Sequence, residues 1–304
     1  MGNKTIKLRA FDVSNETLTS SNKSLFELII SALADKHTIS DRLMLLNQDS
    51  NQSYVLAYSE TGTQNNYIFG LVLEVTPYEN GGELSKDLLN ESSISLSQVT
   101  QARENSLLCQ DHFYFLLTPN LLIANCKRSS IISKLQTYLN WLIDNTRGDL
   151  VMSFAPIIET INFVEPKEIR SLEIGNVKMS IDTATGIKTL DVKKCLGSLF
   201  DEVPELQTLR NNEILQAFLT LKFKKPTKMT PEKFASLIGE FAKSVETSDS
   251  IKITNKKGRT IKGSQIEKNK DITVNCTIEG LIVEQELKLA MQQYIQDIRN
   301  ERKE

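Results

Sequence analysis

Apolar and polar residues alternate along several short stretches of this chain, a spacing typical of β-strands with one buried face. In the first half, stretches that alternate in this way or are rich in β-branched and aromatic residues predict strands. These are residues 6–10, 42–46, 53–58, 67–76, 112–117 and 121–126. The last two flank Thr118, Pro119 and Asn120, which are common turn formers, so we expect a hairpin there.

Other stretches carry apolar residues every three or four positions, as amphipathic helices do. Residues 25–35, 130–145 and 283–302 predict three helices, and residues 192–200 predict a shorter one. Ser24 can cap the first helix. Thr230 and Pro231 open a further helix, because a threonine N-cap followed by proline is a favoured helix start. The apolar stripe of the 283–302 helix suits either the core of the protein itself or a partner chain.

The second half opens with predicted strands at 150–154 and 171–181. From residue 219 onward, apolar residues alternate with lysine or threonine, which predicts strands around 219–224, 251–254, 261–262 and 272–278 and a turn at 255–258. If these strands pair consecutively as a meander, their apolar faces lie on the Thr230 helix. The opposite face would then present Lys222, Lys224, Lys252 and Lys262, with Lys256, Lys257 and Arg259 at one tip.

This order of elements predicts a mixed α/β chain of the α+β class, with antiparallel or mixed sheets that are each covered by helices on one face. Arg147, Gly148 and Asp149 follow the 130–145 helix and are typical of a connection. We therefore expect two domains, and the length of 304 residues allows them. The first is an α/β domain at 1–148, and the second, at 149–304, contains the basic sheet and the last helix.

Positive charge is concentrated in one part of the chain. The whole sequence has 36 Lys or Arg and 38 Asp or Glu, a formal net charge of −2. Residues 219–270 contain thirteen basic and five acidic residues, a local charge of +8, whereas the remaining 23 basic residues face 33 acidic ones. Surface lysines also serve solubility and discourage the pairing of strand edges. Their concentration on consecutive strands, with the acids elsewhere, favours a face that binds a polyanion.

The polyanion that we expect is double-stranded DNA. Arg259 is the single arginine among the basic residues of the window, and bidentate reading of bases favours arginine, so phosphate contacts with little sequence preference are expected. The candidate DNA-binding residues are Lys222, Lys224, Lys225, Lys228, Lys252, Lys256, Lys257, Arg259, Lys262 and Lys268. An anionic membrane surface would use the same charges but usually adds an exposed apolar wedge. A module that docks an acidic protein is the alternative from a different class.

Motifs for catalysis are few. His37 and His112 are far apart, and no HExxH, GxSxG, P-loop or Cys/His metal spacing occurs, so we expect neither a metal site nor a cofactor. A metal-dependent nuclease is the best enzymatic alternative, because Asp149, Glu165 and Lys167 have the acid…Glu-x-Lys order of such sites. Pro166 interrupts the strand on which these ligands should alternate, which favours a solvated turn.

The cellular compartment is predicted from cysteines and apolar segments. Cys109, Cys126, Cys195 and Cys276 have no CxxC spacing and lie in apolar segments, as buried and reduced cysteines do. The first residues lack an apolar signal core. The longest apolar stretch, 25–34, is far shorter than the roughly 20 residues of a membrane span. We expect a cytoplasmic protein.

Several local stretches resemble the RexA-type DNA-binding proteins of lambda-like phage exclusion systems. They are the 24–37 helix ending in Leu33-Ala34-Asp35 before His37, the 219–225 strand before a lysine-rich helix, and 248–251 leading into the Gly258 hairpin, followed by the terminal amphipathic helix. The sequence is similar, more loosely, to RdgC-type DNA-binding proteins. The resemblance implies a cytoplasmic homodimer that binds DNA, acts as a sensor in abortive infection and signals to a membrane protein. Residues 77–110 do not share it.

Overall fold

The protein is a mixed α+β chain with antiparallel sheets, as predicted. The structure, a computed structural model, describes residues 2–15, 25–45, 53–62, 66–77, 83–95, 106–126, 130–143, 152–159, 166–175, 219–222, 230–231, 234–235, 238–239, 250–278 and 280–302. Two compact units are present. The first contains Met1–Lys127, Thr137–Asp144 and Asn269–Glu304, and the second contains Arg128–Gln136 and Asn145–Lys268. This grouping differs from the predicted division at residue 148, because the last strand and the last helix belong to the first unit.

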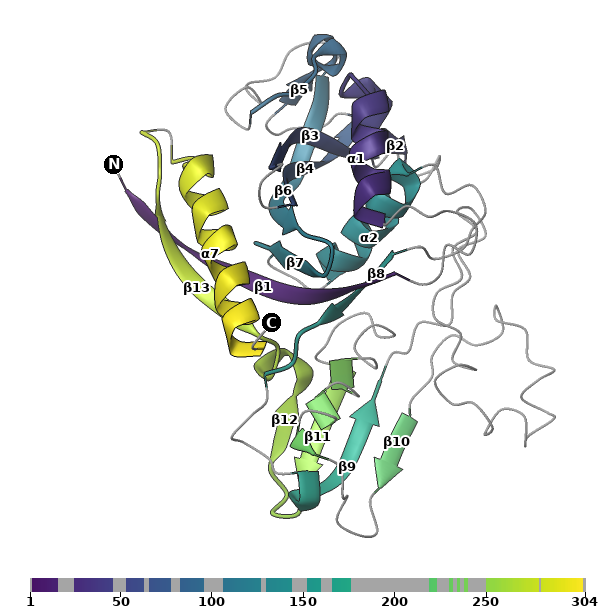
Figure 1. The fold of residues 1–304 in the computed structure, drawn as a ribbon, viewed down its shortest axis with the longest axis vertical. Helices are drawn as coiled ribbons and strands as arrows, with labels where there is room; N and C mark the ends of the chain where they lie inside the picture. The colour runs from purple at the N-terminus through teal and green to yellow at the C-terminus, as the bar shows by residue number, and fades with distance from the viewer. Residues whose placement is uncertain are drawn as a thin grey trace, which may run out of the picture. The chain divides into compact units, whose positions relative to one another are not determined.

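The first unit is built on one large antiparallel sheet (Figure 1). The order of its strands is β13-β1-β7-β6-β4-β3-β2, and β5 pairs with β6. The strands are β1 (Asn3–Asn15), β2 (Leu43–Leu45), β3 (Ser53–Gly62), β4 (Tyr67–Pro77), β5 (Glu83–Ser85), β6 (Ser106–Leu117), β7 (Leu121–Ala124) and β13 (Asn269–Asn275). The six strands predicted in the first half are all present, and β5 is an addition.

The predicted hairpin between β6 and β7 is confirmed. Phe115, Leu116 and Leu117 pair with residues of β7. Thr118 closes the turn twice: its backbone N–H donates to the carbonyl oxygen of Leu121 at 2.8 Å, and its Oγ1 accepts the N–H of Leu121 at 3.0 Å. A threonine at this position therefore satisfies the backbone groups that a tight turn would otherwise leave exposed.

The predicted meander is wrong at its last strand. β13 pairs with β1 along its whole length, with Ile272 opposite Ile6 and Lys270 opposite Leu8. The alternation at 272–278 indicated a strand that overlaps β13, although β13 ends at Asn275 and Ile278 is exposed. Alternation defines which residues share a face and leaves the partner strand open. The apolar residues of β1 require a partner with the same two-residue period, and β13 provides it.

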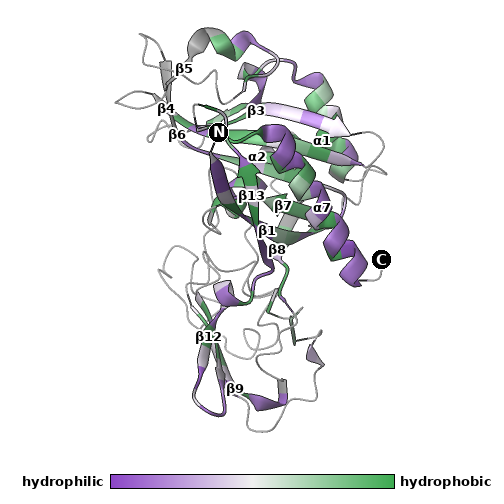
Figure 2. Ribbon diagram, turned by 90° about the vertical axis from the view of Figure 1, so that its left-hand side faces the viewer, coloured by the Kyte–Doolittle hydropathy of each residue, from purple (hydrophilic) through white to green (hydrophobic). Residues whose placement is uncertain are grey.

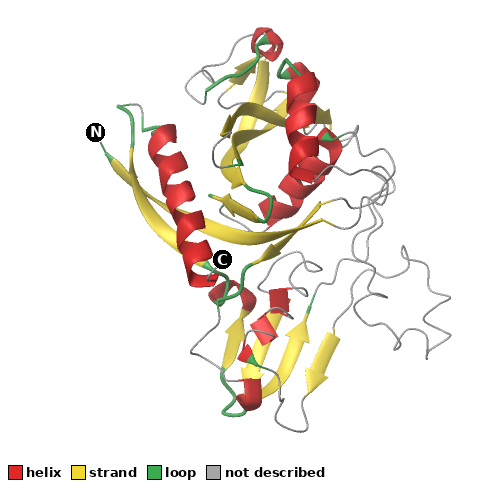
Figure 3. Ribbon diagram, in the orientation of Figure 1, coloured by secondary structure: helices red, strands yellow, loops and turns green. Residues whose placement is uncertain are grey.

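Three helices lie where the apolar spacing predicts them. α1 spans Leu25–Asp35, α2 spans Ser130–Leu142 and α7 spans Glu284–Arg302. α7 contacts β13, β7 and β6, and its stripe of Leu287, Met291, Tyr294, Ile295 and Ile298 is buried against this sheet (Figure 3). The stripe therefore belongs to the core of the unit. No helix within the described ranges has both the length and the apolar character needed to cross a bilayer.

Strand β6 is buried on both faces, although the sequence predicts sheets covered on one face. Phe113, Tyr114, Phe115, Leu116 and Leu117 are consecutive, and each is less than 5% exposed. Since side chains alternate across a strand, both faces of β6 must be covered.

The hydroxyl of Tyr138 in α2 connects this helix to β3 and to the 3₁₀ helix Ser40–Arg42. It accepts the N–H of Leu56 at 3.0 Å and donates to the carbonyl oxygen of Arg42 at 2.6 Å. The Arg42 guanidinium is itself buried and donates to the carbonyl oxygens of Thr38 and Ser92. Buried polar groups are tolerated in this way when they are hydrogen-bonded.

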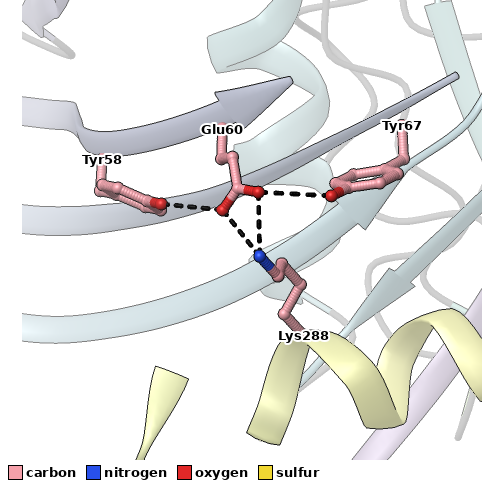
Figure 4. A network of polar contacts seen from close by, with 4 residues as sticks. All are labelled: Tyr58, Glu60, Tyr67 and Lys288. Carbon is pink, nitrogen blue, oxygen red and sulfur yellow. Dashed lines mark hydrogen bonds and ion pairs between the residues drawn. The ribbon is translucent and has the colours of Figure 1, made fainter. Parts of the chain in front are cut away.

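A polar network fastens α7 to β3 and β4 (Figure 4). Lys288 is buried, and its Nζ donates to both carboxylate oxygens of Glu60 at 2.9 Å. Tyr58 and Tyr67 donate their hydroxyls to the same carboxylate at 3.0 and 3.3 Å. The bond from Lys288 is the main cause of a lowered pKa of Glu60, and burial raises the pKa of Tyr58 to about 12.

The second unit contains a small antiparallel sheet of order β10-β9-β11-β12. Its strands are β9 (Ile169–Ile174), β10 (Leu219–Lys222), β11 (Ile251–Asn255) and β12 (Thr260–Lys262), and β8 (Met152–Pro156) belongs to the same unit. The predicted meander is wrong here too, because β9 lies between β10 and β11. Residues 231, 234–235 and 238–239 are helical, and the N–H of Phe234 donates to the carbonyl oxygen of Thr230 at 3.0 Å, as the predicted helix start requires. The helix predicted at 192–200 lies outside the described residues.

We predict that Lys288→Met destabilises the protein by about 1–2 kcal/mol, because the Glu60 carboxylate loses its charged partner while partial exposure to solvent limits the loss. The pH dependence follows from Glu60. Its pKa is lowered in the folded state from an ordinary 4.5, so the pair stabilises the fold above that pH and the stabilisation is lost as the pH falls through the lowered value. Thermal unfolding between pH 7 and pH 3 measures both effects.

The matched control is Lys4→Met, which removes an exposed lysine from β1 and should change stability by less than about 0.5 kcal/mol. Glu60→Gln should flatten the acid-side loss of stability relative to the unchanged protein. An unaltered pH profile in Glu60→Gln would contradict the role given to this ion pair.

Candidate nucleic-acid interface

The small sheet of the second unit has one apolar face and one polar face. Ile251, Ile253 and Ile261 are buried, whereas Lys252 and Lys262, which alternate with them, are exposed. The pairing of Ile253 with both Leu172 and Ile261 carries the apolar face across three strands. The lysines therefore lie on the opposite, solvent-facing side, as the alternation predicts.

Two lysines lie directly opposite each other on this outer face. Lys252 of β11 is the register partner of Lys262 of β12. The neighbouring pair on the same face is Thr254 and Thr260, whose hydroxyl oxygens are hydrogen-bonded at 3.0 Å. Directly opposed residues of antiparallel strands have Cβ atoms about 4.5–5.5 Å apart, and like charges in such positions destabilise a sheet. Neither lysine forms an ion pair with any residue that the structure describes.

The turn between β11 and β12 carries three further cationic residues, Lys256, Lys257 and Arg259, all exposed. In Figure 2 this turn, which leads into β12, is coloured hydrophilic. Asn255 organises it: its Oδ1 accepts the N–H of Arg259 at 2.9 Å, and its carbonyl oxygen accepts the N–H of Gly258 at 3.0 Å. The predicted turn at 255–258 is confirmed.

The hairpin is also fixed from the side. The backbone N–H of Lys256 donates to the carbonyl oxygen of Glu168, which lies in the short 3₁₀ helix Pro166–Glu168 just before β9. Gly258 has a φ of +81°, a conformation that glycine adopts at little cost. These backbone constraints keep the three cationic side chains on one short loop.

Strand β10 adds Lys222, which is exposed and opposes Ser171 of β9. We call the surface formed by Lys222, Lys252, Lys262, Lys256, Lys257 and Arg259 the basic face. The structure thus assembles six of the ten predicted residues on one sheet and its hairpin turn. Lys224, Lys225 and Lys228 lie outside the described residues.

Two lysines of the charged window lie away from the basic face. Lys268 follows β12 in the sequence and lies outside the four strands of the sheet. Its own backbone N–H donates to the carbonyl oxygen of Ile157 at 2.7 Å. Lys270 belongs to β13 of the first unit, where its Nζ is 2.6 Å from the Asp297 carboxylate of α7. The window of residues 219–270 therefore includes lysines that do not belong to the basic face.

One acidic residue of this surface was not among the candidates predicted from the sequence. Glu173 of β9 is half-buried and lies between β10 and β11, with Thr220 on one side and Lys252 on the other. A signal was present, because 171–181 was predicted as a strand, but the charged window began at residue 219. Only the observed strand order brings Glu173 next to the lysines.

No cluster of three or more His, Cys, Asp or Glu that could hold a metal ion occurs among the described residues. Of the nuclease pattern, Asp149 and Glu165 lie outside them, and Lys167 is exposed in the Pro166–Glu168 3₁₀ helix. His37 is exposed just after α1, whereas His112 lies in β6 with its ring edge-on to Tyr114. Cys126 and Cys276 are buried and form no disulfide bond, as predicted for them.

Comparison with protein-family models finds no match for the chain, and comparison with curated proteins finds none either. The similarity to RexA-type proteins therefore stays an expectation from local sequence alone.

We predict that Gly258→Val destabilises the hairpin by about 1–2 kcal/mol, because a β-branched residue is strained at positive φ. Gly258→Asn is the matched control, since asparagine tolerates this conformation and a Cβ at residue 258 would meet no atom within 4 Å. Hydrogen exchange of residues 251–262 should be faster in the valine variant than in the asparagine variant. Equal exchange in both would contradict the described turn.

Proposed function

We propose that the protein binds double-stranded DNA without sequence preference through the basic face. The observation that carries this proposal is the placement of Lys252 directly opposite Lys262 on an exposed sheet surface. Opposed like charges cost stability in the free protein. A phosphodiester backbone lying over the two lysines is attracted by both of them. Solubility alone does not require two lysines in directly opposed positions.

The dimensions of the sheet support a duplex as the ligand. Adjacent strands lie about 4.8 Å apart, so β10 and β12, separated by three intervals, are about 14 Å apart. This separation is comparable with the major groove of B-DNA, about 12 Å wide. Lys222 on β10 and Lys262 on β12 can therefore reach phosphates on the two sides of one groove.

The residue types favour phosphate contacts over base reading. Five of the six residues of the basic face are lysines, which act as flexible point charges, whereas arginine is favoured for bidentate contacts with guanine. Contacts with phosphates position a protein on DNA but carry no sequence information directly. The ligand is therefore duplex DNA of any sequence.

The wider role that we propose rests on the similarity to RexA-type proteins: a cytoplasmic homodimer that senses phage infection and signals to a membrane protein. The stripe of α7 is buried in its own unit, so the homodimer must use another surface. Light scattering at micromolar concentration should give the mass of two chains, and the mass of one chain would remove this part of the proposal.

We predict a steep salt dependence of DNA binding. If the six cationic groups of the basic face each neutralise one phosphate, the logarithm of the association constant falls with the logarithm of salt concentration at a slope of about −5. Fluorescence anisotropy with random-sequence duplexes across a salt series measures this slope. A slope near zero would rule out binding of this kind.

Reversal of the turn charges should abolish binding. The variant Lys256→Glu, Lys257→Glu and Arg259→Glu replaces three cations by three anions on the tip of the hairpin. Its matched control is Lys4→Glu with Lys7→Glu, which reverses two exposed lysines of β1 in the first unit. Retention of duplex binding by the turn variant, or an equal loss in the control, would overturn the proposal. Capture of an acidic protein in the presence of nuclease, without duplex retention, would favour the docking module instead.

A further inference from the structure

Glu173 occupies the centre of the basic face. It is the single acidic residue in the sequences of β9, β10, β11 and β12. The register aligns Thr220, Glu173, Lys252 and Lys262 in one row across the four strands. The carboxylate therefore lies between the lysine of β10 and the lysines of β11 and β12.

The position of the Glu173 carboxylate is not explained by an ion pair with Lys252. Glu173 and Lys252 are register partners on adjacent strands, yet the ion pairs between described residues do not include them. The backbone of Glu173 is paired within the sheet, and its side chain is half-buried on the outer face. Its negative charge thus remains available to act on whatever lies over the sheet.

A duplex and a single strand would meet this charge differently. Two phosphate rows of a duplex can follow the two flanks of the face, over Lys222 on one side and Lys252 with Lys262 on the other. The groove between those rows would then lie over Glu173, so that no phosphate row runs directly over the carboxylate. A single strand has one backbone, and its strongest attraction to both flanks lies along the centre, directly over Glu173.

We propose that Glu173 is a specificity-determining residue that favours double-stranded over single-stranded DNA at the basic face. This inference rests on the proposed DNA binding. The carboxylate repels a phosphate row that runs along the centre of the sheet more strongly than phosphates that lie over the two flanks, because repulsion between like charges falls with distance. Specificity of this kind arises from a repulsive element directed against the wrong ligand.

The test uses Glu173→Gln, which keeps the shape of the side chain and removes its charge. Fluorescence anisotropy is measured at about 0.15 M salt, where the Debye length is about 8 Å, for a random-sequence duplex and for a single strand of the same length. We expect the variant to bind the single strand about threefold to tenfold more tightly than the unchanged protein does, as the removal of one nearby unit charge allows. Its affinity for the duplex should change by less than about twofold, because the phosphates of the duplex lie farther from residue 173.

Asp271→Asn is the matched control, because it removes one exposed carboxylate from β13 of the first unit. It should leave the ratio of single-strand to duplex affinity unchanged. Glu173→Ala provides a second variant, and the same change of ratio is expected from it. Thermal unfolding of each variant confirms that the fold is retained.

The outcomes separate the two proposals. Failure of the unchanged protein to bind either DNA overturns the proposed function and this inference with it. Duplex binding by the unchanged protein with an unaltered ratio in both Glu173 variants overturns the inference alone. An equal gain for duplex and single strand also overturns it, because the carboxylate would then repel DNA without discrimination.

Discussion

The pairing of β11 with β12 is the constraint on which the proposed interface depends. It fixes Lys252 opposite Lys262 and leaves Lys256, Lys257 and Arg259 on the connecting turn. A shift of the register by one residue would turn the lysines toward the apolar side and expose the isoleucines. Burial of the isoleucines therefore keeps the lysines on the solvent-facing side. The apolar and the electrostatic properties of this hairpin are therefore two consequences of one alternation.

The two units use charged residues in different ways. In the first, ion pairs between described residues attach α7 to the sheet: Lys288 with Glu60, Lys270 with Asp297, and Arg302 with Asp12 at 2.8 Å. These pairs satisfy their charges within the fold. On the basic face of the second unit, Lys252 and Lys262 have no carboxylate partner among the described residues, and the nearest register neighbour, Glu173, leaves Lys252 unpaired. Cationic groups that have no carboxylate partner within the fold can attract an anionic ligand.

Local pattern predicted the elements of this fold well, because helical and strand periodicities are properties of the segment itself. The helix at 25–35 is α1, and the apolar spacing at 283–302 gives α7 within one residue at its start. The partners of the strands were not predictable in the same way. β9 lies between β10 and β11, and β13 pairs with β1 and not with a strand of the small sheet. Several strands of this chain have compatible apolar faces, so local sequence does not decide which of them pair. Only the long-range packing selects among them.

The candidate site shows the same limit. The alternation at 251–262 correctly predicted which lysines share an exposed face, and the turn at 255–258 was recognisable from its residues. Glu173 entered the face through a pairing some 80 residues distant along the chain, between β9 and β11, which no local pattern carries. Conversely, Lys268 and Lys270 were near in sequence but lie outside the face.

If the basic face lies against DNA, bound duplex shields its lysines from chemical modification, and lysine reactivity measures this most directly. Amine acetylation with and without random-sequence duplex, read by mass spectrometry, reports the burial of each ammonium group separately. We expect protection by duplex at Lys222, Lys252, Lys256, Lys257 and Lys262, and equal modification with and without duplex at Lys4 and Lys7. Unchanged reactivity of the basic face in the presence of bound duplex, or protection confined to Lys4 and Lys7, would contradict it.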